Sequence, residues 1–189
     1  LTQRKFYRVT GGSTQNKGVV PDIKLVDIYN EEFGERKAKN ALKWDTIPTA
    51  PFKREGSVQP YVQTLAQMSQ QRVNVDPQFK YLEQRKAIAK KTDEQKRVVL
   101  DIDLRKAELN ALEQKTLEAE NQRRSLTGQK PYANWESYQA SMDALIESRA
   151  KMKATQRPAL PEEETFVKES ANILLDYAKL QSSTQAARQ

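Results

Sequence analysis

The feature that most constrains the fold is a change of periodicity along the chain. Strand and turn residues are confined to about the first 23 positions, whereas helix signals dominate the rest. Residues 2–9 include several β-branched and aromatic side chains in an alternating arrangement, which predicts a strand. Turn signals follow at Gly11-Gly12-Ser13 and Asn16-Lys17-Gly18, and Val19-Val20 before Pro21 predicts a second, short extended segment. A hairpin alone is marginally stable in water, so we expect these strands to belong to a sheet.

Caps and prolines mark the first two helices. Pro60 suits the first turn of a helix whose apolar positions recur at three- and four-residue spacing as far as Val73. Asp76 is a good N-cap and Pro77 fits the first helical position, which predicts a second helix directly after the first. The two helices are therefore expected to be separated by a break at Asp76-Pro77.

The third helix has a competing interpretation. Asp101 can cap a helix that runs from Ile102 to about Arg124 and is ended by Gly128. Residues 98–104 also alternate apolar and polar side chains, which is typical of an extended segment. Length favours the helix, because its pattern continues far beyond this stretch.

Two more helices are predicted towards the C-terminus. Asn134 is the cap of a helix with the clearest apolar stripe in the chain, which begins at Trp135. Pro158 and Pro161 separate a last helix that opens with Glu162-Glu163-Glu164, where negative charge favours the N-terminal dipole. Because adjacent residues on a helix point in different directions, we interpret the triplet as a dipole effect and not as a metal site.

The helical region is expected to fold around a core of its own. The predicted core residues are Leu65, Phe79, Leu82, Leu109, Leu112, Trp135, Tyr138, Met142, Leu145, Leu174 and Tyr177. Before this region the periodicity is lost, and Trp44 and Phe52 are expected to pin an ordered connector to a neighbouring surface. The predicted fold is mainly α, with terminal strands of a sheet at 1–26, a connector at 27–57, a helical domain at 58–182 and a polar tail at 183–189.

The composition excludes most catalytic machinery. The 189 residues include no cysteine and no histidine. This excludes disulfides, thiolate chemistry, a Ser-His-Asp triad and ordinary zinc sites. No pair of carboxylates is placed for acid–base catalysis. We therefore predict no catalytic residue, no cofactor and no metal for this chain, and expect it to be inactive alone.

The net charge of +7 makes nucleic acid a candidate partner. Most of the surplus lies before residue 58, and the charges after it are nearly balanced and interspersed. Runs such as Lys90-Lys91 and Arg123-Arg124 are interpreted as exposed helix faces. A nucleic-acid binder is therefore the less favoured alternative, and a stand-alone helical protein-interaction module is the stronger one.

A combined pattern in the opening segment carries a family resemblance. It consists of Leu1-Thr2, Lys5-Phe6-Tyr7, Gly12-Ser13-Thr14-Gln15 and Gly18-Val19-Val20-Pro21-Asp22-Ile23. The pattern resembles that of carboxy-terminal processing peptidases, also called tail-specific proteases, which are serine peptidases with a Ser-Lys dyad. In that family the pattern lies at the C-terminal end of the peptidase domain. The longer branch is similar again at residues 40–45 and in having a helical C-terminal domain with a Val-Val-Leu-Asp-like segment, here residues 98–101.

The catalytic motifs of that family do not occur in this chain. Neither its Ser-Ala-Ser-like motif nor its Gly-Lys-Gly motif is found. Ser13 lies in a turn with Lys17 close in sequence, but without the motif we interpret this serine as structural. Leu1 is neither an initiator methionine nor the start of a signal peptide. We therefore expect a C-terminal, non-catalytic part of a longer protein.

The resemblance implies a periplasmic, envelope-associated endopeptidase that takes chains by their C-termini through a PDZ domain. Its implied partners are the upstream peptidase and PDZ domains of the same chain, protein substrates and an adaptor protein. The helical domain would pack on the peptidase core and shape the substrate enclosure, or dock the adaptor. In isolation, the cut edge of the sheet is expected to pair weakly with a second copy through residues 1–23.

Overall fold

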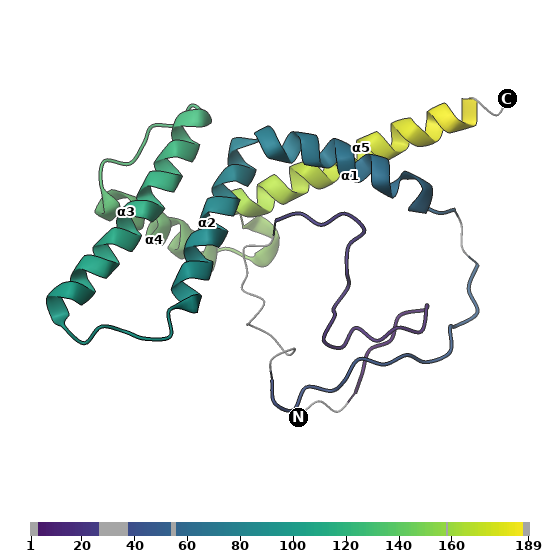
Figure 1. The fold of residues 1–189 in the computed structure, drawn as a ribbon. Coiled ribbons are helices and arrows are strands. Elements are labelled where there is room, and N and C mark those ends of the chain that lie inside the picture. The colour runs from purple at the N-terminus through teal and green to yellow at the C-terminus, as the bar shows by residue number, and fades with distance from the viewer. Residues whose placement is uncertain (1–3, 27–37, 54–55, 158, 187–189) are drawn as a thin grey trace. The chain divides into compact units, whose positions relative to one another are not determined.

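Helices dominate the computed structural model, which describes residues 4–26, 38–53, 56–157 and 159–186 (Figure 1). The helices are α1 Gln59–Val75, α2 Pro77–Glu94, α3 Ile102–Leu126, α4 Trp135–Lys151 and α5 Pro161–Ala186, with a short 3-10 turn, η2, at Ala154–Gln156. Among the described residues, β-structure is limited to two isolated bridges. The prediction of a mainly α fold is confirmed.

The predicted helix starts are confirmed by their caps. The Asp76 carboxylate accepts the backbone N–H of Gln78 at 2.7 Å, at the start of α2. Asn134 and Ser137 form a reciprocal capping box at the start of α4. These bonds satisfy backbone donors that have no partner inside the helix. The helix boundaries are therefore set by local chemistry.

Residues 98–104 do not form one extended segment, so the competing interpretation is wrong. Helix α3 begins at Ile102, and the Asp101 carboxylate accepts two backbone N–H groups of its first turn at 2.9 and 3.0 Å. The cap satisfies donors that an extended segment could satisfy only by pairing with another strand. Leu100, just before the cap, is 98% exposed.

The N-terminal hairpin is present but much shorter than predicted. An antiparallel bridge joins Tyr7 and Ser13, flanked by the N–H of Thr14 bonded to the Phe6 carbonyl at 3.0 Å. A strand over residues 2–9 is wrong within its described part, because pairing does not extend beyond this bridge. The hairpin and the segment around Thr46 that pairs with Gly12 are joined only by isolated bridges, which is too little pairing to stabilise a long ladder.

Both predicted turns are confirmed. Gly11 has a φ of +84° in the first turn, and Asn16 and Gly18 have φ values of +60° and +61° in the second. Positive φ is the conformation for which glycine is favoured, and asparagine tolerates it better than most residues.

Internal contacts divide the chain into two units. The first unit comprises Leu1–Leu25 and Tyr29–Gln67, and the second comprises Val26–Ile28 and Met68–Gln189. Helix α1 therefore begins in the first unit and ends in the second. The predicted boundaries at residues 26, 57 and 182 remain predictions, and residues 27–37 and 187–189 lie outside the described residues.

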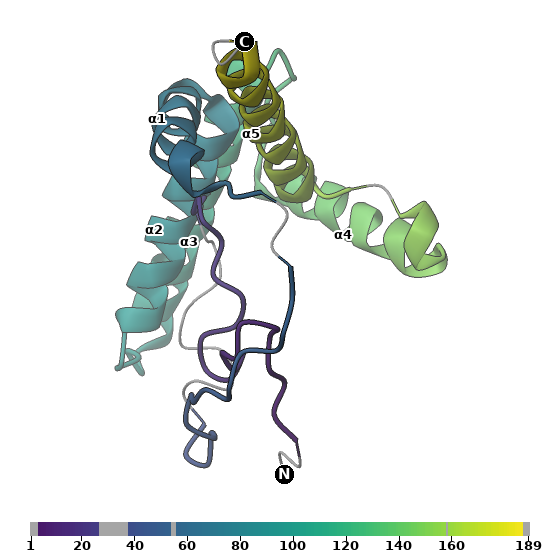
Figure 2. The same cartoon turned by 90° about the vertical axis from the view of Figure 1, so that its right-hand side faces the viewer.

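The core of the second unit lies where α2 contacts α3 and α5, with α4 packed on α3 (Figure 2). Phe79 and Leu82 on α2 are 2% and 1% exposed. The rings of Phe79 and Phe166, on α5, pack edge to face with 6.1 Å between their centroids. Four buried apolar residues are not in the predicted core list: Val73 on α1, Tyr81 on α2, and Leu117 and Ala119 on α3.

The predicted core list is partly right. Leu65, Phe79, Leu82 and Tyr138 are buried, as predicted. The prediction is wrong for Leu109 and Leu174, which are 42% and 65% exposed. The remaining members are only partly buried: Leu112, Trp135, Met142, Leu145 and Tyr177. Periodicity identifies an apolar stripe on a helix, but only the contacts between helices decide whether that stripe is covered.

Candidate functional site

The first unit joins the hairpin to the connector through backbone pairing. Gly12 and Thr46 form the second antiparallel bridge. The N–H of Ser13 donates to the Asp45 carbonyl at 3.0 Å, and the N–H of Ile47 donates to the Gly11 carbonyl at 2.8 Å. The described part of the connector is therefore ordered by running alongside the hairpin.

Polar side chains add further contacts between the hairpin and the connector. The Asp45 carboxylate accepts the Lys5 ammonium at 2.9 Å and the Tyr7 hydroxyl at 3.1 Å. The hydrogen bond from Lys5 lowers the pKa of Asp45. Trp44 donates its indole N–H to the Ser13 carbonyl at 2.8 Å, and the Lys17 ammonium lies 3.7 Å from the centre of the Trp44 ring. The prediction that Trp44 pins the connector is confirmed.

Ser13 and Lys17 are not arranged as a nucleophile and its base. Ser13 is 4% exposed, and its hydroxyl oxygen accepts the backbone N–H of Gln15 at 2.9 Å. The Lys17 ammonium stacks on Trp44 instead. A catalytic serine has to face a substrate and hand its proton to a neighbouring base. The contacts of Ser13 are those of a turn.

The N-terminal segment of the first unit buries polar side chains and exposes large apolar ones. Ser13 and Gln15 are buried, whereas large apolar side chains are exposed on both arms of the segment. The exposed fractions are 73% for Phe6, 66% for Val19 and 54% for Val20. Phe52, which was predicted to pin the connector, is also exposed. This unit therefore has an apolar surface that suits a covering partner.

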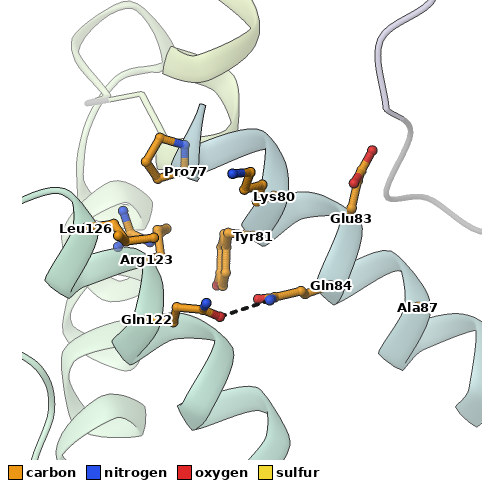
Figure 3. Close-up of a pocket in the computed structure, with 9 residues that line it drawn as sticks. All are labelled: Pro77, Lys80, Tyr81, Glu83, Gln84, Ala87, Gln122, Arg123 and Leu126. Atoms are coloured by element: carbon orange, nitrogen blue, oxygen red, sulfur yellow. Dashed lines mark hydrogen bonds between the residues drawn. The ribbon is translucent and has the colours of Figure 1, made fainter. Parts of the chain in front are cut away.

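The second unit has a pocket of about 360 Å³ between α2 and α3 (Figure 3). Tyr81 lies between the two helices, and Gln84 donates to Gln122 beside it at 3.0 Å. Its other lining residues are Pro77, Lys80, Glu83, Ala87, Arg123 and Leu126. The size is at the lower end for a small-molecule site, and the lining offers no nucleophile beside a base. We assign no catalytic role to this pocket.

Arg123 corrects the prediction for the Arg123-Arg124 run. Its side chain is 6% exposed, and its guanidinium donates two hydrogen bonds to the Glu120 carboxylate at 2.5 and 2.8 Å. It also lies 5.3 Å from the centre of the Tyr81 ring. Burial, followed by the negative charge of Glu120, raises the pKa of Tyr81 far above its ordinary value. A charge run on a helix can thus hide a buried pair, and the three-residue spacing of Glu120 and Arg123 was its only local signal.

A second buried ionic cluster joins α1 to α5. The Arg72 guanidinium donates to both oxygens of Glu169, at 2.8 to 3.2 Å, and to Asp176 at 2.6 Å. The side chains of Glu169 and Asp176 are 4% and 11% exposed. Burial alone would raise the pKa of Glu169, but hydrogen bonds from Arg72, Ser69 and Asn172 outweigh it and lower the pKa. The sequence did not indicate this cluster, because its members are about a hundred positions apart.

We expect this cluster to make stability depend on acid pH. The folded-state pKa of Glu169 lies below that of the unfolded chain, so its contribution is complete above the ordinary pKa of about 4.3. The contribution is lost as pH falls through the folded-state value. Urea unfolding between pH 3 and 7 should show a weaker decline below about pH 4.5 for Glu169→Gln than for the wild type. If stability declined equally with pH in Glu169→Gln and in the wild type, the role of Glu169 would be contradicted. Glu147→Gln, in an exposed ion pair, is the control and should behave like the wild type.

The acidic triplet at the start of α5 forms ion pairs and hydrogen bonds with the protein. Glu162 accepts from Arg85 at 2.6 Å, and Glu163 accepts the backbone N–H of Leu160 at 2.7 Å. Within the described ranges, no group of acidic residues is arranged to hold a metal ion. In the same part of the chain, no helix is long and apolar enough to cross a membrane.

The described residues form a helical domain and an N-terminal segment with exposed apolar side chains, and among them no side chains are arranged as a nucleophile with its base. Residues 28–179 match the family described as C-terminal domain of tail specific protease (DUF3340). The tail-specific protease of Haemophilus influenzae is 36% identical over 134 residues, which cover 68% of this chain and 19% of that protein. The chain therefore belongs to the tail-specific protease family and contains its C-terminal domain. It spans about a fifth of the length of this relative.

Proposed function

We propose that the chain is the C-terminal, non-catalytic part of a periplasmic, envelope-associated serine endopeptidase that degrades or processes proteins from their C-termini. The observation that carries this proposal is the N-terminal segment of the first unit, in which the large apolar side chains of Phe6, Val19 and Val20 are exposed. An upstream peptidase domain of the same chain would supply the missing cover. Membership of the tail-specific protease family supports this arrangement.

In this proposal the two units have different tasks. Residues 1–26 add to the edge of the peptidase sheet, where backbone groups pair with a neighbouring strand. The lysine of an upstream Ser-Lys dyad must be neutral to accept the serine proton, and burial lowers its pKa. The added segment helps to bury it. The helical domain packs on the peptidase core, where it shapes the substrate enclosure or docks an adaptor protein.

We expect the isolated chain to cleave neither casein nor unstructured peptides with free C-termini, because the family's Ser and Lys motifs are absent from it. The complete polypeptide, with its upstream part, should cleave both. Fluorescence release from labelled substrates measures the two preparations side by side. Cleavage by the isolated chain that survives purification and is abolished by Ser13→Ala would overturn the proposal, as would an inactive complete polypeptide that is folded.

The isolated chain should also self-associate weakly through residues 1–23. An uncovered extended segment with exposed apolar side chains is a template for a second copy, and an antiparallel pair is its simplest closure. Lys5, Arg8 and Lys17 oppose close pairing and weaken it at low salt. Deleting residues 1–23 should leave the helical circular dichroism almost unchanged and convert any dimer to monomer in sedimentation. A dimer that persists would favour a stand-alone interaction module.

A further inference from the structure

The most deeply buried side chains of helix α5 are polar: Thr165, Glu169 and Asp176 are only 4 to 8% exposed. Apolar side chains such as Phe166 and Tyr177 are partly buried beside them. Other apolar side chains of the same helix face outward, and the exposed fractions are 69% for Val167 and 65% for Leu174. Surface helices normally bury the apolar face and expose the polar one. The outer face of α5 therefore requires an explanation.

The exposed apolar residues form one continuous stripe. Val167, Ala171, Leu174 and Ala178 follow one another at spacings of four, three and four, which places them on one side of a helix. Leu175, next to the stripe, is 58% exposed. Phe166 lies off the stripe and contacts Phe79 in the core. We call these five residues, Val167, Ala171, Leu174, Leu175 and Ala178, the outer stripe.

The Arg72 cluster keeps the outer stripe outside. Arg72 binds Glu169 with two nitrogens and Asp176 with a third contact, seven positions further along α5. Contacts two turns apart fix the rotation of α5 about its axis. Turning the helix to bury the stripe would break them and leave buried charges without partners, which is costly. The packing of α5 therefore keeps the outer stripe exposed.

We propose that the outer stripe docks on a part of the same polypeptide that lies upstream of this sequence. This inference rests on the proposed function. About four-fifths of the matched relative lies outside the aligned region, so most of the polypeptide is available to cover the stripe. The stripe thus forms a contact of the helical domain with the peptidase part.

The size of the outer stripe favours a tethered partner over a second copy. It has five residues, whereas a stable complex between separate proteins places roughly 20 to 30 residues on each side. A tethered domain needs less area, because the linker holds it at a high effective concentration. Contacts between domains of one chain are also smaller and more polar than those of obligate dimers.

Hydrogen–deuterium exchange in two contexts tests the proposal. Amides of residues 165–180 should exchange roughly tenfold more slowly in the complete polypeptide than in the isolated chain. Leu174→Gln should abolish this difference by raising exchange in the complete polypeptide only. The matched control is Ile146→Gln on α4, which replaces a residue with 59% exposure and should leave the difference intact.

Two results would overturn the proposal. One is equal exchange of residues 165–180 in both contexts. The other is a concentration-dependent dimer of the isolated chain that Leu174→Gln dissociates, which would assign the stripe to a second copy. Proteolysis by the wild-type complete polypeptide is measured separately. If it is normal while the exchange is equal, the proposed function stands and the docking of α5 is wrong.

Discussion

Replacing Arg72 by alanine is expected to lower the free energy of unfolding of the second unit by about 3 kcal/mol. Arg72 is the shared partner of Glu169 and Asp176, whose side chains are 4% and 11% exposed. Without the guanidinium, two carboxylates remain in a buried site with a like charge beside them. Most of the loss is the cost of these uncompensated charges, and not the strength of the ion pair itself. Urea unfolding followed by far-ultraviolet circular dichroism measures the loss.

Two further variants make this result specific. Arg72→Lys keeps the charge but cannot form the paired hydrogen bonds, so its loss should be intermediate. Lys151→Ala removes an exposed pair with Glu147, in which the side chains are 72% and 68% exposed, and should cost less than about 0.5 kcal/mol. If Arg72→Ala cost no more than Lys151→Ala, the cluster would be unimportant for stability. The argument that it fixes the rotation of α5 would then fail as well.

Replacing Gly11 by alanine is expected to separate the hairpin from the connector. A Cβ atom at this position would lie 2.1 Å from the Ile47 carbonyl oxygen, and the residue has a φ of +84°. The clash involves backbone, so the backbone hydrogen bond from Ile47 to Gly11 cannot survive it. The Trp44 indole N–H, which bonds to Ser13 in the same turn, should lose at least roughly tenfold protection from hydrogen exchange.

Gly18→Ala is the matched control for this experiment. Gly18 also has positive φ, at +61°, but an added Cβ would meet nothing within 4 Å. Its cost should be limited to the strained backbone, about 1 kcal/mol, and Trp44 should keep its protection. Nuclear magnetic resonance resolves the two indole N–H signals of Trp44 and Trp135. Unchanged protection of Trp44 in Gly11→Ala would show that the pairing of hairpin and connector does not depend on this close approach.

Short-range features of this protein were predictable from sequence. Asp76 and Asn134 begin helices because their side chains bond to backbone groups two or three residues away. Gly11 adopts positive φ because the turn needs it. The family resemblance was carried by the opening residues, and the matched C-terminal domain follows them from residue 28 to residue 179.

Long-range features were decided only by the tertiary structure. The apolar spacing of Leu174 predicted a core position, yet Leu174 is exposed because Glu169 and Asp176 of the same helix turn inward and bind Arg72. Arg123 was predicted to be exposed and is buried against Glu120 and Tyr81. Periodicity shows that a helix has two different faces. Which face turns inward depends on partners far away in sequence, and for α5 the pairing of Arg72 with two buried carboxylates outweighs the burial of a few aliphatic side chains.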